Sequence, residues 1–215
     1  MGHHLDEFIS WEQHIQKVTA KLASANYAIG RVKNFLPLNI RKTLYNSMFR
    51  CHAEFGVLAW GCAAQPKLNK ILNLQKKCVR NVANTGPKSH TDPIFAKFSI
   101  LKFNDLFKHN VYSFLHKFHF KKLPMSFNGF FQLQRDTEQR QVRENHDNYV
   151  VSLPLNKNVS RFPRPIFAPI WNGLSDTIKA TGSHSVFKRQ CKEAIIDGYE
   201  TMVDCDNATC EDCNP

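Results

Sequence analysis

The sequence has no long apolar run. Its longest candidate, residues 55–64, covers about half of the roughly 20 residues that a membrane-spanning helix needs. Asp6 and Glu7 stand where a secretory signal would carry Lys or Arg. The seven cysteines are odd in number and mostly scattered, which favours reduced thiols over a disulfide framework. We therefore expect a cytoplasmic or nuclear protein that is not secreted and contacts no membrane.

The sequence also lacks the common catalytic motifs. It contains no G-x-S-x-G, no phosphate-binding loop, no H-E-x-x-H and no adjacent pair of aspartates. Nucleotidyl transfer needs carboxylates that hold two Mg²⁺ ions. The chain by itself is therefore not expected to be an enzyme of this class. Hydrophobic residues make up 42% of the 215 positions, which is enough to form a core.

Positive charge is abundant and unevenly distributed. The net charge is +11, and residues 66–122 hold twelve Lys and Arg against two acids, Asp92 and Asp105. Residues 197–215 hold six acids and no base. The basic segment favours a polyanionic partner such as RNA or DNA. The alternative is an ordinary solvated surface, which would normally mix both signs of charge.

Apolar residues recur at intervals of three and four, which predicts a mainly α fold. Eight aromatic residues between positions 95 and 120 share this spacing, so core packing is favoured over stacking on bases. The expected helices cover about residues 11–33, 38–60, 66–85, 92–98, 104–120 and 185–199. In the second helix the expected buried row consists of Ile40, Leu44, Met48, Cys51 and Phe55.

Changes of composition divide the chain. A helical domain is expected over residues 11–131, followed by a polar linker over 132–162. Prolines at 163, 165 and 169 open a small C-terminal helical segment over 163–200, and an acidic tail with cysteines covers 201–215. The predicted architecture is thus a helical bundle, a linker and a short helical segment.

The helix over 66–85 has the most suggestive surface. If its apolar row faces inward, Lys70, Lys77 and Arg80 face outward and Lys76 lies at the edge. Lysines near the end of the helix over 104–120 extend the basic surface. Such side chains bind phosphates of any base sequence because they displace condensed counterions. The predicted nucleic-acid contacts are Lys70, Lys76, Lys77, Arg80, Lys117, Lys121 and Lys122.

Two groups of residues contain side chains of the kinds that bind metal ions. Cys205, Cys210 and Cys213 form C-x4-C-x2-C, which contains half of a tetrahedral zinc site. No fourth ligand is close in sequence, and the acidic tail would attract any cation, so both interpretations stay open. His116 and His119 lie three apart on a helix, but without a nearby partner their spacing favours two surface side chains.

Several short motifs occur in a recognisable order. They include residues 2–11 with His14, Trp60-Gly61, residues 74–80 (LQKKCVR), residues 90–95 (HTDPIF) and residues 170–174 (IWNGL). This order resembles the region that follows the catalytic palm in non-LTR (LINE-type) retrotransposon reverse transcriptases of the jockey and CR1 kind. The resemblance covers about residues 1–199.

The resemblance implies a thumb-like helical region of an RNA-directed DNA polymerase, with residues 1–10 as the end of the palm. In that family the Mg²⁺-binding aspartates lie upstream, in a Y/F-x-D-D motif that this sequence does not contain. The implied partners are RNA and DNA as template and primer, and the missing palm and fingers. The implied function is therefore nucleic-acid binding without catalysis. The alternative is a helical protein-interaction module or a non-functional relic of the element.

Overall fold

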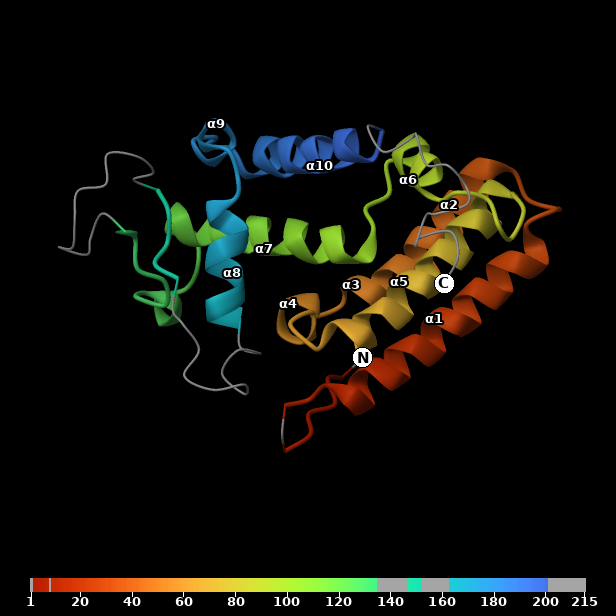
Figure 1. Ribbon diagram of the computed structural model, residues 1–215, viewed down its shortest axis with the longest axis horizontal. Coiled ribbons are helices and arrows are strands. Elements are labelled where there is room, and N and C mark those ends of the chain that lie inside the picture. The colour runs from red at the N-terminus through yellow and green to blue at the C-terminus, as the bar shows by residue number, and fades with distance from the viewer. Residues whose placement is uncertain (1, 8, 135–146, 152–162, 201–215) are drawn as a thin grey trace. The chain divides into compact units, whose positions relative to one another are not determined.

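The computed structural model describes residues 2–7, 9–134, 147–151 and 163–200 (Figure 1). These residues are mainly helical, which confirms the predicted fold class. Within them, β pairing is limited to one antiparallel bridge between Leu133 and Tyr149. Most of the predicted linker over 132–162 lies outside the described residues. No helix in the described part of the chain is long and apolar enough to cross a membrane.

The chain forms two compact units that differ from the predicted domains. Unit 1 comprises residues 1–106 and 194–215, and unit 2 comprises residues 107–193. The predicted domain over 11–131 is therefore divided, and the predicted segment over 163–200 contributes to both units. The reason is that two helices, α7 (Phe103–His119) and α10 (His184–Glu200), supply core residues to each unit.

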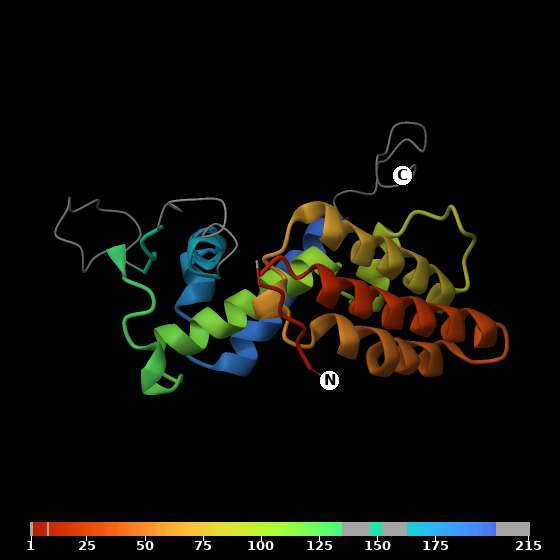
Figure 2. The same ribbon diagram turned by 90° about the horizontal axis from the view of Figure 1, so that it is seen from below.

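Unit 1 is built on three rows of helix that lie side by side (Figures 1 and 2). Its first helix, α1, begins one residue after Trp11. It buries the row expected from the spacing of three and four, which consists of Ile15, Val18, Leu22, Ala25 and Ile29. The third row, α5, likewise buries the row expected from its spacing, except that Leu72 is only half-buried. That row consists of Leu68, Ile71, Leu72, Gln75, Val79 and Val82. The helices of unit 1 before α7 are α1 (Glu12–Val32), α2 (Leu38–Leu44), the π-helix η1 (Tyr45–Arg50), α3 (Cys51–Glu54), α4 (Val57–Trp60), α5 (Gln65–Ala83) and α6 (Asp92–Phe98).

The prediction for the helical run over 38–60 was wrong in its buried face. The core-facing residues are Tyr45, Phe49, Ala53, Val57 and Trp60, each at most 3% exposed. The expected row is partly open to solvent, with Ile40 42%, Met48 36% and Phe55 41% exposed. Residues 45–50 form a π-helix, whose i to i+5 hydrogen bonds put more residues into each turn. The wider turn favours the row spaced by four that begins at Tyr45.

The same run is interrupted at Gly56. This glycine has φ of +61°, a left-handed conformation that side-chain-bearing residues rarely adopt, so α3 ends and α4 starts anew. The break frees the carbonyl of Phe55, which accepts a hydrogen bond from Trp60 Nε1 at 2.9 Å. The helix predicted to be continuous over 38–60 is therefore divided, although its expected end at Gly61 is confirmed.

Two buried polar side chains connect distant parts of unit 1. Gln75 on α5 donates to Tyr45 Oη at 2.9 Å and to the Leu101 carbonyl at 2.8 Å, and it accepts from the Phe103 amide at 2.6 Å. The Tyr199 hydroxyl on α10 accepts from the Lys102 amide at 3.1 Å and donates to Asp105 at 2.5 Å. Residues 101–105 are therefore held from both sides by satisfied hydrogen bonds.

Unit 2 has an aromatic core. Trp171 and Phe187 are fully buried, and Tyr149 is 1% exposed. Trp171 Nε1 donates to the Asp147 carbonyl at 2.9 Å, and the Asn172 side chain both donates to and accepts from the backbone of Tyr149. Residues 147–149 are thus fixed by two neighbours on α8. The short helices of unit 2 are η2 (Met125–Phe127), α8 (Pro163–Asn172) and α9 (Asp176–Lys179).

The described cysteines are free thiols, three of them buried. Burial raises the pKa of Cys62, Cys78 and Cys191 to about 12 each, which makes them weak nucleophiles near neutral pH. Cys51 is exposed.

Candidate nucleic-acid interface

The exposed side of α5 is cationic and polar. The helix contains five Lys or Arg residues and no acid over its 19 residues. Asn69, Lys70, Asn73 and Lys77 are exposed and follow one another at helical spacing. Arg80 is half-buried, and its Nε donates to the Ser89 carbonyl at 2.8 Å. Lys and Asn side chains are both able to contact phosphate oxygens.

Lys76 does not lie at the edge of this surface. Its side chain is buried, with 7% of the residue exposed. The physical reason is that α5 packs against α1, the α2–η1 run and α6, so its buried arc is wider than one apolar row. The burial of Lys76 argues against its predicted role as a phosphate contact, and we leave it out of the candidate interface.

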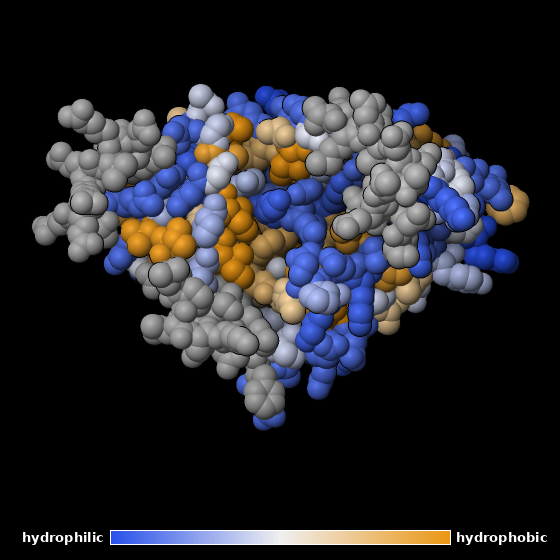
Figure 3. Space-filling model, viewed as in Figure 1, coloured by the Kyte–Doolittle hydropathy of each residue, from blue (hydrophilic) through white to orange (hydrophobic). Residues whose placement is uncertain are grey.

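The two acids of the basic segment, Asp92 and Asp105, both interact with residues of unit 1. Asp92, whose side chain is 5% exposed, forms an ion pair with Lys102 at 2.9 Å. Asp105 accepts the hydrogen bond from Tyr199, and its negative charge adds to burial in raising the pKa of that tyrosine. Hydrophilic residues cover much of the lower part of α1 and α5 in the space-filling view (Figure 3). The exposed cations of α5 are thus not paired with these two carboxylates. The carboxylate that does lie beside this helix is Glu12 of α1, which forms an ion pair with Lys67 and interacts electrostatically with Lys70.

Unit 2 has a second group of cations. Lys117, Lys121 and Lys122 are exposed, and Lys122 Nζ donates to the Gly182 carbonyl at 3.3 Å. Burial lowers the pKa of His184 to about 4, and the neighbouring His116, Lys117, Lys188 and Lys122 lower it further. Lysines from α7, the turn after it and α10 thus surround one histidine. The sequence gives no sign that Lys188 joins this group, because Lys188 lies more than sixty positions after Lys122 and belongs to another helix.

His116 and His119 are not the surface pair that their spacing favoured. His116 is fully buried, and His119 is half-buried. His116 Nε2 lies 2.7 Å from the Thr181 carbonyl, and its Nδ1 lies 3.2 Å from Nδ1 of His184. Because a carbonyl only accepts, His116 Nε2 carries a proton, and its neutral Nδ1 accepts from His184. His184 Nε2 then accepts from the Ser113 hydroxyl at 3.2 Å.

The structure thus assigns the predicted cations to two separate places. Lys70, Lys77 and Arg80 belong to unit 1, and Lys117, Lys121 and Lys122 belong to unit 2. Among the described residues, no three His, Cys, Asp or Glu side chains are grouped so that they could hold a metal ion. The zinc candidates Cys205, Cys210 and Cys213 lie outside the described residues.

Comparisons with known proteins found no counterpart of this chain. No family model matches it, and neither a curated protein nor a solved structure does.

Proposed function

We propose that this chain is the post-palm fragment of a retrotransposon RNA-directed DNA polymerase and binds RNA and DNA without regard to base sequence. The observation that carries the binding function is the exposed side of α5, to which this helix contributes Lys70 and Lys77 but no acid, while Glu12 of α1 pairs with Lys67. The two carboxylates of the basic segment have partners within unit 1. Asp92 pairs with Lys102, and Asp105 accepts a hydrogen bond from Tyr199. The assignment to a polymerase rests on the ordered motifs alone. In a complete enzyme, Mg²⁺ would be held by aspartates outside this sequence.

Each unit would contribute its own phosphate contacts. Lys70, Lys77 and Arg80 would serve unit 1, and Lys117, Lys121 and Lys122 would serve unit 2. Lysines bind phosphate as point charges on flexible stems, so these contacts would tolerate different sequences and both kinds of strand.

Binding to a fluorescent RNA–DNA duplex should depend steeply on salt. With about six phosphates contacted, log affinity should fall against log salt with a slope near −5 between about 50 and about 300 mM. Fluorescence anisotropy of the full chain measures this slope. A slope near zero would contradict the proposal.

A charge-matched pair of variants tests whether α5 is the contact. Lys70→Gln with Lys77→Gln should make the slope shallower by about 2, because each lost phosphate contact removes about 1. Lys17→Gln with Lys21→Gln removes the same charge from exposed positions on α1 and serves as the control. Equal effects of both pairs would show that net charge, and not the α5 surface, is responsible.

The alternative function is a helical protein-interaction module, and a different observation favours it. Ile40, Met48 and Phe55 form a partly exposed apolar row along the α2–α3 run. Exposed large apolar side chains that gather on one helical run mark contact sites in many proteins. Sedimentation of the chain at increasing concentration separates the two functions. Self-association that Met48→Lys abolishes, together with a flat salt dependence of duplex binding, would favour the alternative.

A further inference from the structure

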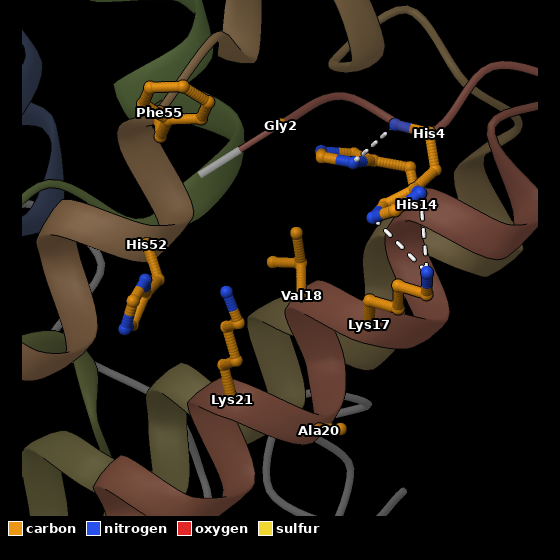
Figure 4. Close-up of a pocket in the computed structure, with 9 residues that line it drawn as sticks. All are labelled: Gly2, His4, His14, Lys17, Val18, Ala20, Lys21, His52 and Phe55. Atoms are coloured by element: carbon orange, nitrogen blue, oxygen red, sulfur yellow. Dashed lines mark hydrogen bonds between the residues drawn. The ribbon is translucent and has the colours of Figure 1, made fainter.

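Unit 1 contains a cavity of about 300 Å³ away from the outer side of α5. Its walls come from the first residues of the chain, from one side of α1 and from α3 with the residue after it (Figure 4). This volume is at the lower end of the range found for small-molecule sites. The residues that line it are Gly2, His4, His14, Lys17, Val18, Ala20, Lys21, His52 and Phe55.

His14 presents an unpartnered polar atom to this cavity. The residue is 3% exposed, and its Nε2 has no hydrogen-bond partner. In Figure 4 its ring extends from α1 toward the space bounded by Gly2, Val18 and Phe55. A buried polar atom without a partner is uncommon and costs stability unless a ligand or water satisfies it.

The other ring nitrogen determines which kind of partner is missing. The backbone amide of His4 donates to His14 Nδ1 at 3.5 Å, so Nδ1 is the acceptor. Burial, followed by the positive charges of His3, His4 and Lys21, lowers the pKa of His14 to about 4, so the ring is neutral near neutral pH. A neutral imidazole that accepts at Nδ1 carries its proton at Nε2. The unpartnered atom is therefore a donor that lacks an acceptor.

The charges around the cavity are all positive. Lys17 and Lys21 lie four residues apart on α1, and Lys17 Nζ is 3.2 Å from the His4 ring nitrogens. The positive charge of Lys21 also lowers the pKa of His52, after burial. None of the described residues that line the cavity is acidic. Val18, Ala20 and Phe55 supply the apolar part of the wall, and Phe55 stacks on His3 with the ring centroids 5.2 Å apart.

We propose that this cavity binds a small organic carboxylate with a planar apolar body. The carboxylate accepts from His14 Nε2 and interacts with the ammonium groups of Lys17 and Lys21. The apolar body lies against Val18 and the exposed ring of Phe55. Neither lysine belongs to the proposed phosphate contacts, so this site is separate from duplex binding.

Titration calorimetry with two probes of the same shape tests the proposal on the full chain. Naphthoate, which carries the carboxylate, should bind about tenfold or more tightly than naphthylmethanol, which has the same ring system without the charge. Lys21→Gln should weaken naphthoate binding about tenfold and leave naphthylmethanol unaffected. Equal affinities of the two probes for the unaltered chain would overturn the proposal.

Two further variants locate the site. Ala20→Trp places a large side chain at an exposed lining position and should abolish naphthoate binding while the far-UV circular dichroism spectrum stays unchanged. Lys70→Gln removes one charge from the outer side of α5 and should leave naphthoate binding as it is. If Ala20→Trp binds naphthoate normally, or if Lys70→Gln weakens it as much as Lys21→Gln does, the cavity is not the site.

Discussion

Phe49→Ala is expected to lower the free energy of unfolding of unit 1 by about 3 to 5 kcal/mol, whereas Met48→Ala should change it by less than about 1 kcal/mol. The two residues are adjacent in η1, but Phe49 is fully buried and Met48 is 36% exposed. Phe49 also stacks on Tyr45 with the ring centroids 5.4 Å apart. Removing the Phe49 ring leaves a cavity between η1 and its neighbours, while Met48 loses only partial contact.

Urea unfolding followed by circular dichroism gives the two free energies. Hydrogen exchange of peptides from α1 and α5 then assigns the loss to unit 1, because these helices pack against η1. The two losses of free energy should differ clearly because the π-helical register buries Phe49. An ordinary helix with the predicted row would bury Met48 instead. A larger loss for Met48→Ala than for Phe49→Ala would show that the register is wrong.

Acidification from about pH 6.5 to about pH 4.5 is expected to destabilise both units through neutral histidines. The pKa values of His14 in unit 1 and His184 in unit 2 are both lowered to about 4, mainly by burial. Between about 4 and the unfolded value near 6.5, the unfolded chain binds more protons than the folded chain. Stability from these groups is therefore full above pH 6.5 and is lost as the pH falls toward 4. For the buried His14 the total loss is on the order of 3 kcal/mol.

In unit 2 the hydrogen bonds give a second reason for acid sensitivity. His184 Nδ1 donates to His116 Nδ1, and His116 Nε2 donates to the Thr181 carbonyl. A proton added to His116 Nδ1 would make that atom a donor as well, so it would face the N–H of His184 with no acceptor between them. The neighbouring charges are Lys117 on α7, Lys122 in the following turn and Lys188 on α10, all of which oppose protonation.

Thermal melting at a series of pH values measures these losses. His184→Gln, which cannot be protonated, should flatten the pH dependence of unit 2, and His90→Gln at a half-exposed position is the matched control. Trp11 and Trp60 lie 5.9 and 5.6 Å from the His14 ring, centroid to centroid, so their fluorescence reports on unit 1. A melting temperature that is constant over this pH range would contradict the assignment of neutral histidines.

Much of the helical structure could be predicted from the sequence. The bounds of α1, α5, α6 and α7 lie within one or two residues of the expected ranges, since their apolar spacing is regular and Gly or Pro lies near several of the ends. The buried face of residues 38–60 could not be predicted, because two apolar rows offset by one or two residues compete there. The helix α8 lies in the segment over 163–200 that was predicted to be helical, but its bounds could not be predicted, because it contains Pro169 in its interior, where proline removes a hydrogen bond.

The candidate sites were predictable only where a single helix determined them. The exposure of Lys70 and Lys77 followed from the spacing of α5, whereas the burial of Lys76 depends on how many neighbours that helix has. The grouping of Lys188 with Lys117 and Lys122 joins two distant helices. The cavity beside His14 combines residues 2–4, 14–21 and 52–55, and no local pattern marks such a combination.

The division of unit 1 along the chain has a consequence for the order of folding during translation. Tyr199 bonds to residues 102 and 105, which are 97 and 94 positions earlier, so unit 1 is interrupted by the whole of unit 2. On the ribosome, residues 107–193 all emerge before Tyr199 does. Until then Asp105 and the Lys102 amide lack their partner, so unit 1 cannot be completed before the chain of unit 2 has been synthesised.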